Sequence, residues 1–219
     1  MPEVVTSADA HAAFAERAAA LVERLVVERG RARLAVTGGS AARAVEDAFV
    51  HLVARGVDLS RVLVTWIDER CVPPDAPDSN RGTLRLPAGV GCVLPLFERG
   101  ETPTEAVERL ERELVARFDG ALDVTLLGLG PDGHIASLFP GRPDPAGRAA
   151  YIADSPKPPP RRITLTRAML ATADHALLVA RGEGKREALE RLAAGDPGLP
   201  ATGLRGLVLF TDLELRTTR

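Results

Sequence analysis

One segment, Val124–Gly141 (VTLLGLGPDGHIASLFPG), constrains the fold more than any other part of the chain. It opens with a mostly apolar run, Val124–Leu127, which predicts a buried strand. Three glycines follow closely, at Gly128, Gly130 and Gly133. Glycine lets the backbone turn sharply and approach a ligand closely. Because open α/β sheets bind ligands at the carboxyl ends of their strands, the segment predicts a site at the edge of such a sheet.

The rest of the chain alternates between helical and strand-like patterns. Apolar positions recur at helical spacing in residues 8–29, 41–55, 104–118 and 185–193. Short apolar runs typical of buried strands occupy residues 34–37, 62–67, 124–127, 163–165, 176–180 and 207–210, with a weaker candidate at 151–153. This alternation favours βαβ units. We predict a Rossmann-like α/β fold with a mostly parallel sheet and helices on both faces, and one domain over residues 1–219.

Composition narrows the classes of partner. The chain has 219 residues, 45% of them hydrophobic, and a formal net charge of -2, so neither nucleic acid nor an anionic membrane is expected as a partner. No secretion signal or membrane-spanning run is recognisable. Cys71 and Cys92 form no metal or redox motif and are expected to be buried. We expect a soluble cytoplasmic protein, a monomer or small homo-oligomer, that uses no metal and no cofactor.

A first candidate site is the loop Gly38-Gly39-Ser40, which lies between a predicted strand and a predicted helix. Backbone N–H groups and the helix dipole make such a helix start an anion site. Arg43 falls in the first turn, where the dipole disfavours a cation unless an anion lies nearby. The alternative is an ordinary turn in which Ser40 caps the helix.

Acid–base chemistry is indicated at two further places. His134 follows the glycines, and histidine is suited to proton transfer because its unperturbed pKa lies near neutrality. Asp132 lies two residues before it. Asp68 and Arg70 directly follow the second buried strand, which places them at the same predicted sheet edge. The alternatives are a tight Asp-Gly turn with a chance histidine, and a solvated loop with surface ion pairs.

Two basic residues later in the chain complete the set of candidates. Lys185 begins a helix directly after a strand and could bind phosphate as a point charge, and Arg162 precedes the run Ile163–Leu165. A surface lysine is the alternative for Lys185. The glycines of the opening segment also match the dinucleotide fingerprint G-x-G-x-x-G. Pro131 and Asp132 would place a rigid ring and a negative charge where a pyrophosphate rests, so this match is discounted.

Taken in order, these segments resemble the 6-phosphogluconolactonases of the oxidative pentose phosphate pathway. The matching pieces are TGGSAAR at 37–43, WIDERCVPPDAPDSN at 66–80, LGLGPDGHIASLFPG at 127–141, RITLT at 162–166, G-x-G-K at 182–185 and LPATGL at 199–204. The related glucosamine-6-phosphate deaminases share the D-G-H-I-A loop but continue with F-N-E-P. This chain has Ser137-Leu138-Phe139-Pro140 and no carboxylate there, which favours the lactonase.

The resemblance implies hydrolysis of 6-phospho-D-glucono-1,5-lactone to 6-phosphogluconate. We hypothesise that His134 is the general base on the attacking water, oriented by Asp132 or Asp68, and that Arg70 binds substrate or polarises the carbonyl. The phosphate anchor would be Gly38, Gly39, Ser40, Arg43 and Lys185, with Arg162 as a further contact. Glycine-loop N–H groups would supply oxyanion donors.

Three other functions remain as alternatives. A sugar-phosphate isomerase-deaminase would use an aspartate such as Asp68 to abstract a carbon-bound proton and would release ammonia. A non-catalytic sugar-phosphate sensor would be fused to a DNA-binding segment, for which neither terminus has the room or the basic charge. A dinucleotide-dependent oxidoreductase rests on the glycine match alone.

Overall fold

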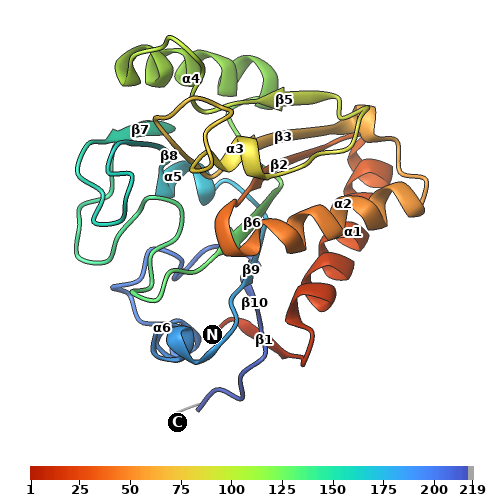
Figure 1. Ribbon diagram of the computed structural model, residues 1–219. Helices are drawn as coiled ribbons and strands as arrows, with labels where there is room; N and C mark the ends of the chain where they lie inside the picture. The colour runs from red at the N-terminus through yellow and green to blue at the C-terminus, as the bar shows by residue number, and fades with distance from the viewer. Residues whose placement is uncertain (217–219) are drawn as a thin grey trace.

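The computed structural model describes residues 1–216, and a seven-stranded parallel sheet forms its centre (Figure 1). The order of the strands is β1-β10-β9-β6-β2-β3-β5, and every neighbouring pair is parallel. Their bounds are β1 Glu3–Thr6, β2 Ala32–Val36, β3 Val62–Trp66, β5 Cys92–Leu94, β6 Val124–Gly128, β9 His175–Val179 and β10 Val208–Thr211. The predicted α/β fold with a mostly parallel sheet is confirmed.

Helices cover both faces of this sheet. Helices α1 (Ala10–Arg29) and α2 (Ala42–Ala54) pack against each other on one face, and α4 (Pro103–Phe118) and α6 (Arg186–Ala193) lie on the other (Figure 1). Topology explains the division. The connections through α1 and α2 run toward the β5 edge, whereas those through α4 and α6 run toward the β1 edge. Because such crossovers are almost always right-handed, opposite directions place the helices on opposite faces.

A second, antiparallel sheet has the order β4-β8-β7, with β4 at Asp68–Arg70, β8 at Arg162–Leu165 and β7 at Ala149–Ile152. The chain crosses between the sheets at Ile67. Its N–H donates to the carbonyl of Val36 in the large sheet at 2.9 Å, and its carbonyl accepts from Leu165 N in the small sheet at 2.8 Å. The strand candidates at 151–153 and 163–165 therefore correspond to strands, but they belong to this separate sheet.

Some elements do not follow from the apolar pattern. The sequence pattern did not predict five elements. These are the edge strands β1 and β5, strand β4, and the one-turn helices α3 (Asn80–Thr83) and α5 (Arg167–Leu170). Strand β4 consists of Asp-Glu-Arg, so no hydrophobic run marks it. Cys71 and Cys92 are half-buried rather than fully buried, and burial raises the pKa of the Cys71 thiol to about 11. None of the helices within residues 1–216 is long and apolar enough to cross a membrane.

The strand order creates a crevice between β2 and β6, which are neighbours at the middle of the sheet. After β2 the chain turns toward β3 across one face, and after β6 it continues toward β9 on the opposite side. Loops leaving adjacent strands in opposite directions open a gap at the carboxyl edge, which is where open α/β sheets bind ligands. The fold therefore predicts a ligand site between the loops that follow these two strands.

Candidate active site

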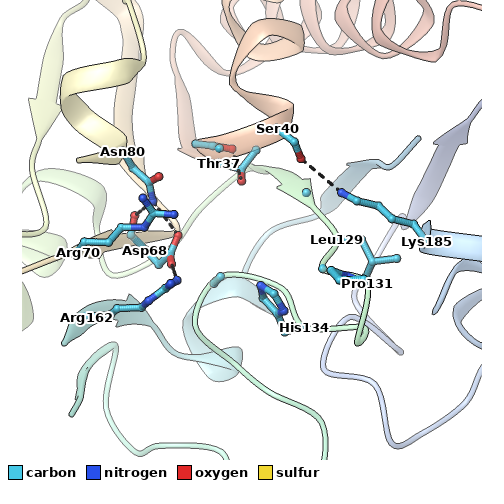
Figure 2. Close-up of a pocket in the computed structure, with 15 residues that line it drawn as sticks. Thr37, Ser40, Asp68, Arg70, Asn80, Leu129, Pro131, His134, Arg162 and Lys185 are labelled. Atoms are coloured by element: carbon cyan, nitrogen blue, oxygen red, sulfur yellow. Dashed lines mark hydrogen bonds and ion pairs between the residues drawn. The ribbon is translucent and has the colours of Figure 1, made fainter. Parts of the chain in front are cut away.

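A cavity of about 290 Å³ lies at this carboxyl edge (Figure 2). Its volume is at the lower end of the range for small-molecule sites, roughly 300–1,000 Å³. The loops after β2, β3, β6 and β9 form its walls together with β8. Eight residues predicted from the sequence line it: Gly38, Gly39, Ser40, Asp68, Arg70, His134, Arg162 and Lys185. Residues separated by nearly 150 positions in the chain thus meet around one space.

His134 presents its ring to the cavity and is held from behind by Asp132. The Asp132 carboxylate contacts Nδ1 of the ring, and its Oδ1 also accepts from the His134 backbone N–H at 3.4 Å. Burial would raise the pKa of Asp132, but the hydrogen bond and charge of His134 outweigh it and lower that pKa. A carboxylate on Nδ1 favours the tautomer with its proton there, which leaves the Nε2 lone pair to act as a base.

The glycines of the 128–133 loop explain how the ring reaches this position. A Cβ at Gly130 would lie 2.1 Å from both Nδ1 and Cε1 of His134, so only glycine leaves room for the imidazole. Gly133 has a φ of +87°, a left-handed conformation that favours glycine. Phe139 packs against the ring, with centroids 4.9 Å apart. The ring is confined by its own loop.

Some backbone N–H groups of the same loop donate to carbonyls within the loop. Gly130 N donates to the His134 carbonyl at 2.8 Å, and Gly133 N donates to the Gly130 carbonyl at 3.0 Å. These two N–H groups are therefore not available to an oxyanion. For them, the prediction that glycine-loop N–H groups serve as oxyanion donors is wrong, because the turn itself needs their hydrogen bonds.

One end of the cavity carries a positive charge. Lys185 Nζ donates to Ser40 Oγ at 3.3 Å, and Ser40 lies in the loop that follows β2 (Figure 2). Burial lowers the pKa of Lys185, because the ammonium has lost part of its hydration. Ser40 makes no capping hydrogen bond to α2, whose N-terminal cap position is Ala41. The Ser40 hydroxyl is thus directed to Lys185 instead of to the helix.

The opposite end of the cavity is built around Asp68, which is 6% exposed. Its carboxylate accepts from Ser137 Oγ at 2.7 Å, Asn80 Nδ2 at 3.1 Å and Arg162 at 3.4 Å. Asp68 therefore binds these three side chains, whereas Asp132 is the acid in contact with the imidazole. The two acids named as alternative partners of His134 occupy different positions.

Two arginines border the same end. Arg162 is 4% exposed and donates to the carbonyls of Lys157 and Pro159 as well as to Asp68. Burial lowers the pKa of Arg162, and the neighbouring Asp68 opposes that shift. Arg70 donates to the carbonyl of Asp78, whereas its buried Nε has no hydrogen-bond partner among the described residues. The side chain of Arg70 also lines the cavity.

Arg43 is the one predicted anchor residue that the structure leaves outside this group. Its guanidinium is largely exposed and forms an ion pair with Asp47 one turn along α2, at 3.0 Å. It does not line the cavity with Lys185 and Ser40. The anion that offsets the unfavourable position of the Arg43 cation in the first turn of α2 is thus the Asp47 carboxylate of the same helix.

The sequence placed Glu69 and Asn80 in the same candidate segment as Asp68 and Arg70 but assigned them no role; Asn80 is 3% exposed and lines the cavity, and its backbone N–H donates to Glu69. Asn80 follows Ser79, which caps α3 by accepting from Gly82 N at 3.0 Å. A serine before a turn signals a cap, and that signal was present in the sequence. Within residues 1–216, no three or more His, Cys, Asp or Glu side chains group so as to hold a metal ion. The absence of a metal and of a cofactor stays a prediction.

Fold and cavity together define an open-sheet α/β protein with its ligand site at the switch point between β2 and β6. The model of the family described as Glucosamine-6-phosphate isomerases/6-phosphogluconolactonase matches residues 6–209. This match covers most of the chain. The chain belongs to that family.

Individual relatives agree with this placement. The 6-phosphogluconolactonase of Rattus norvegicus is 37% identical, over 85% of this chain and 77% of its own. A probable chloroplastic 6-phosphogluconolactonase of Oryza sativa subsp. indica is 35% identical over 84% of this chain, but only 63% of that longer protein is covered. The crystal structure of a 6-phosphogluconolactonase from Thermotoga maritima superposes with a TM-score of 0.81 at 26% identity, covering 96% of this chain and 99% of that one.

Proposed function

We propose that the protein hydrolyses 6-phospho-D-glucono-1,5-lactone to 6-phosphogluconate. The observation that carries this proposal is the His134 ring, which contacts Asp132 and lines a cavity that has Lys185 and Ser40 at one end. The names of the rat and Thermotoga maritima proteins support the same substrate. Their shared family includes isomerases, so the choice of reaction rests on the side chains of the cavity.

The phosphate of the substrate would bind at the Lys185 end. A half-buried ammonium lacks part of its hydration, and a phosphate replaces that hydration with charge-assisted hydrogen bonds. Ser40 Oγ adds a donor beside it, and Gly38 and Gly39 let the backbone approach the phosphate oxygens. Arg43 lies outside the cavity and has no part in this proposal.

Hydrolysis would proceed by base-assisted attack of water. His134 Nε2 takes a proton from a water molecule as its oxygen bonds to the lactone carbonyl carbon, and the carbonyl becomes an oxyanion. Collapse of that tetrahedral intermediate breaks the bond to the ring oxygen, which takes the proton back from His134. Asp132 keeps Nδ1 protonated in the resting state and stabilises the imidazolium between the two transfers.

Arg70 is the donor we assign to the developing oxyanion. Its side chain lines the cavity, and a guanidinium offers N–H donors and a positive charge that stabilise a developing oxyanion. Asp68 would act at a distance from the imidazole, by fixing the amide of Asn80 and the guanidinium of Arg162 at the cavity wall.

The test is the rate of opening of freshly generated lactone, with protein against the spontaneous background. We expect a large acceleration that falls roughly 10²–10⁴-fold in His134→Ala, the usual contribution of a general base. Binding of 6-phosphogluconate, measured by calorimetry, should persist in this variant. His175→Ala is the matched control, because His175 lies at the amino end of β9, whereas the cavity lies at the carboxyl ends of the strands. If folded wild-type protein gives no acceleration, the proposal fails and ammonia release from glucosamine 6-phosphate becomes the next assay.

A further inference from the structure

Glu69 is a buried carboxylate for which the proposed reaction has no use. It lies in β4 between Asp68 and Arg70, which both line the cavity. Because successive side chains of a strand point to opposite faces, Glu69 is directed away from the cavity. It is 3% exposed. A carboxylate buried this deeply is costly unless it is hydrogen-bonded, so its partners show what it is for.

Four donors converge on the Glu69 carboxylate. Oε1 accepts from the backbone N–H groups of Arg70 at 2.8 Å and Asn80 at 2.7 Å. Oε2 accepts from the backbone N–H of Arg81 at 2.7 Å and from Ser79 Oγ at 3.1 Å. Burial raises the pKa of Glu69 despite these bonds. One side chain thus joins both ends of the segment between β4 and α3.

The two groups that this carboxylate fixes both face the cavity. Asn80 Nδ2 donates to the carbonyl of Asp68 at 2.9 Å and to its carboxylate at 3.1 Å. The other side of the amide lies against the phosphate-end loop, since a Cβ at Gly38 would come within 2.3 Å of Asn80 Oδ1. Arg70, whose backbone N–H Glu69 also holds, carries the buried Nε that has no partner in the described chain. Asn80 and Arg70 both line the cavity, at the same end as Asp68 (Figure 2).

We propose that Glu69 is a positioning residue for the reaction: without touching substrate, it sets Asn80 and Arg70 against each other and against the Gly38 loop. This inference rests on the proposed lactonase function. Glu69→Gln keeps the shape of the side chain but replaces one acceptor oxygen with an NH₂ group, which then faces N–H donors. The cavity wall shifts, whereas the sheets remain intact.

Glu111 offers a matched control. It also accepts from two backbone N–H groups, those of Arg148 and Ala149, but it lies on α4 and away from the cavity. We expect lactone hydrolysis by Glu69→Gln to fall roughly 10- to 100-fold in kcat/KM, mainly through kcat, as for the loss of hydrogen bonds to a charged group. Glu111→Gln should stay within threefold of wild type, whatever its change in Tm.

A double-mutant cycle separates positioning from simple loss of stability. If Glu69 acts through Asn80, then Glu69→Gln adds little to Asn80→Ala, whereas Glu111→Gln and Asn80→Ala combine independently. Ser79→Ala, which removes one of the four donors, replaces Glu69→Gln in the cycle if circular dichroism shows that variant to be unfolded. Activity of Glu69→Gln near wild type, or additive effects of Glu69→Gln and Asn80→Ala, would overturn the positioning role alone. An inactive wild-type protein would overturn the proposed function and this role with it.

Discussion

Gly130→Ala tests whether the position of the His134 ring limits the reaction. The backbone at Gly130 is not left-handed, so alanine is compatible with the local conformation. The added Cβ would nevertheless lie 2.1 Å from Nδ1 and Cε1 of His134 and 2.6 Å from Oδ1 of Asp132. Since non-bonded carbon atoms rest at about 3.5 Å, the ring has to move by roughly 1.4 Å.

A displacement of that size can be converted into a rate. Misplacing a catalytic group by about 1 Å costs on the order of 10²-fold, which corresponds to about 2.7 kcal/mol of activation free energy at 1.36 kcal/mol per factor of ten. The ring also leaves the Asp132 carboxylate, so the imidazolium loses its stabilising partner. We therefore expect kcat to fall about 100-fold while KM changes little, because the Lys185 end of the cavity is untouched.

The assay is the opening of freshly generated lactone, corrected for the spontaneous rate, on protein shown to be folded by its Tm. Gly184→Ala is the matched control, because a Cβ at Gly184 meets no atom within 4 Å. Wild-type kcat in folded Gly130→Ala would refute the reasoning, since the reaction would then tolerate a ring displaced from Asp132.

Two further predictions concern charge. Lys185→Ala should raise KM roughly tenfold or more with a smaller change in kcat, because it removes a charge-assisted contact to the phosphate; steady-state kinetics would check this, and an unchanged KM would remove Lys185 from the anchor. Asp123, 2% exposed, accepts several hydrogen bonds from Arg33. Burial would raise the pKa of Asp123, but Arg33 outweighs that effect and lowers it. The stabilisation is thus present above the ordinary aspartate pKa of 3.8 and is lost as pH falls through the lower pKa of the folded protein. Asp123→Asn should cost about 3 kcal/mol at pH 7 in urea unfolding, and a gap from wild type that does not shrink toward pH 2 would contradict this sign.

The central strands could be predicted from the sequence because each is a continuous apolar run followed by glycines or charges. Strands β2, β3 and β6 are covered on both faces, and such strands leave this pattern. The small sheet could not be predicted in this way. Strand β4 is three charged residues whose pairing with β8 depends on a chain reversal far along the sequence.

The candidate site divides in a similar manner. Residue types at strand ends were enough to bring His134, Asp68 and Lys185 to one cavity. Choosing between Asp132 and Asp68 as the partner of the imidazole required three-dimensional distances, because both are acids at the same sheet edge. The prediction that Arg43 binds the phosphate failed for a local reason. Asp47 lies one helical turn away, so its carboxylate is a nearer partner for the guanidinium than the cavity is.

The pairing of β1 with β10 also has a consequence for how the chain reaches this state. Glu3 is opposite Val208, so the first described strand is partnered only by the last described one. Until β10 is synthesised, β1 has no neighbour and the β9 edge of the sheet stays uncovered. Such non-local pairing is slow, because closing a long loop costs entropy before any contact compensates for it. Completion of the sheet therefore depends on β10, and until that strand is in place the β9 edge remains an unpaired strand edge.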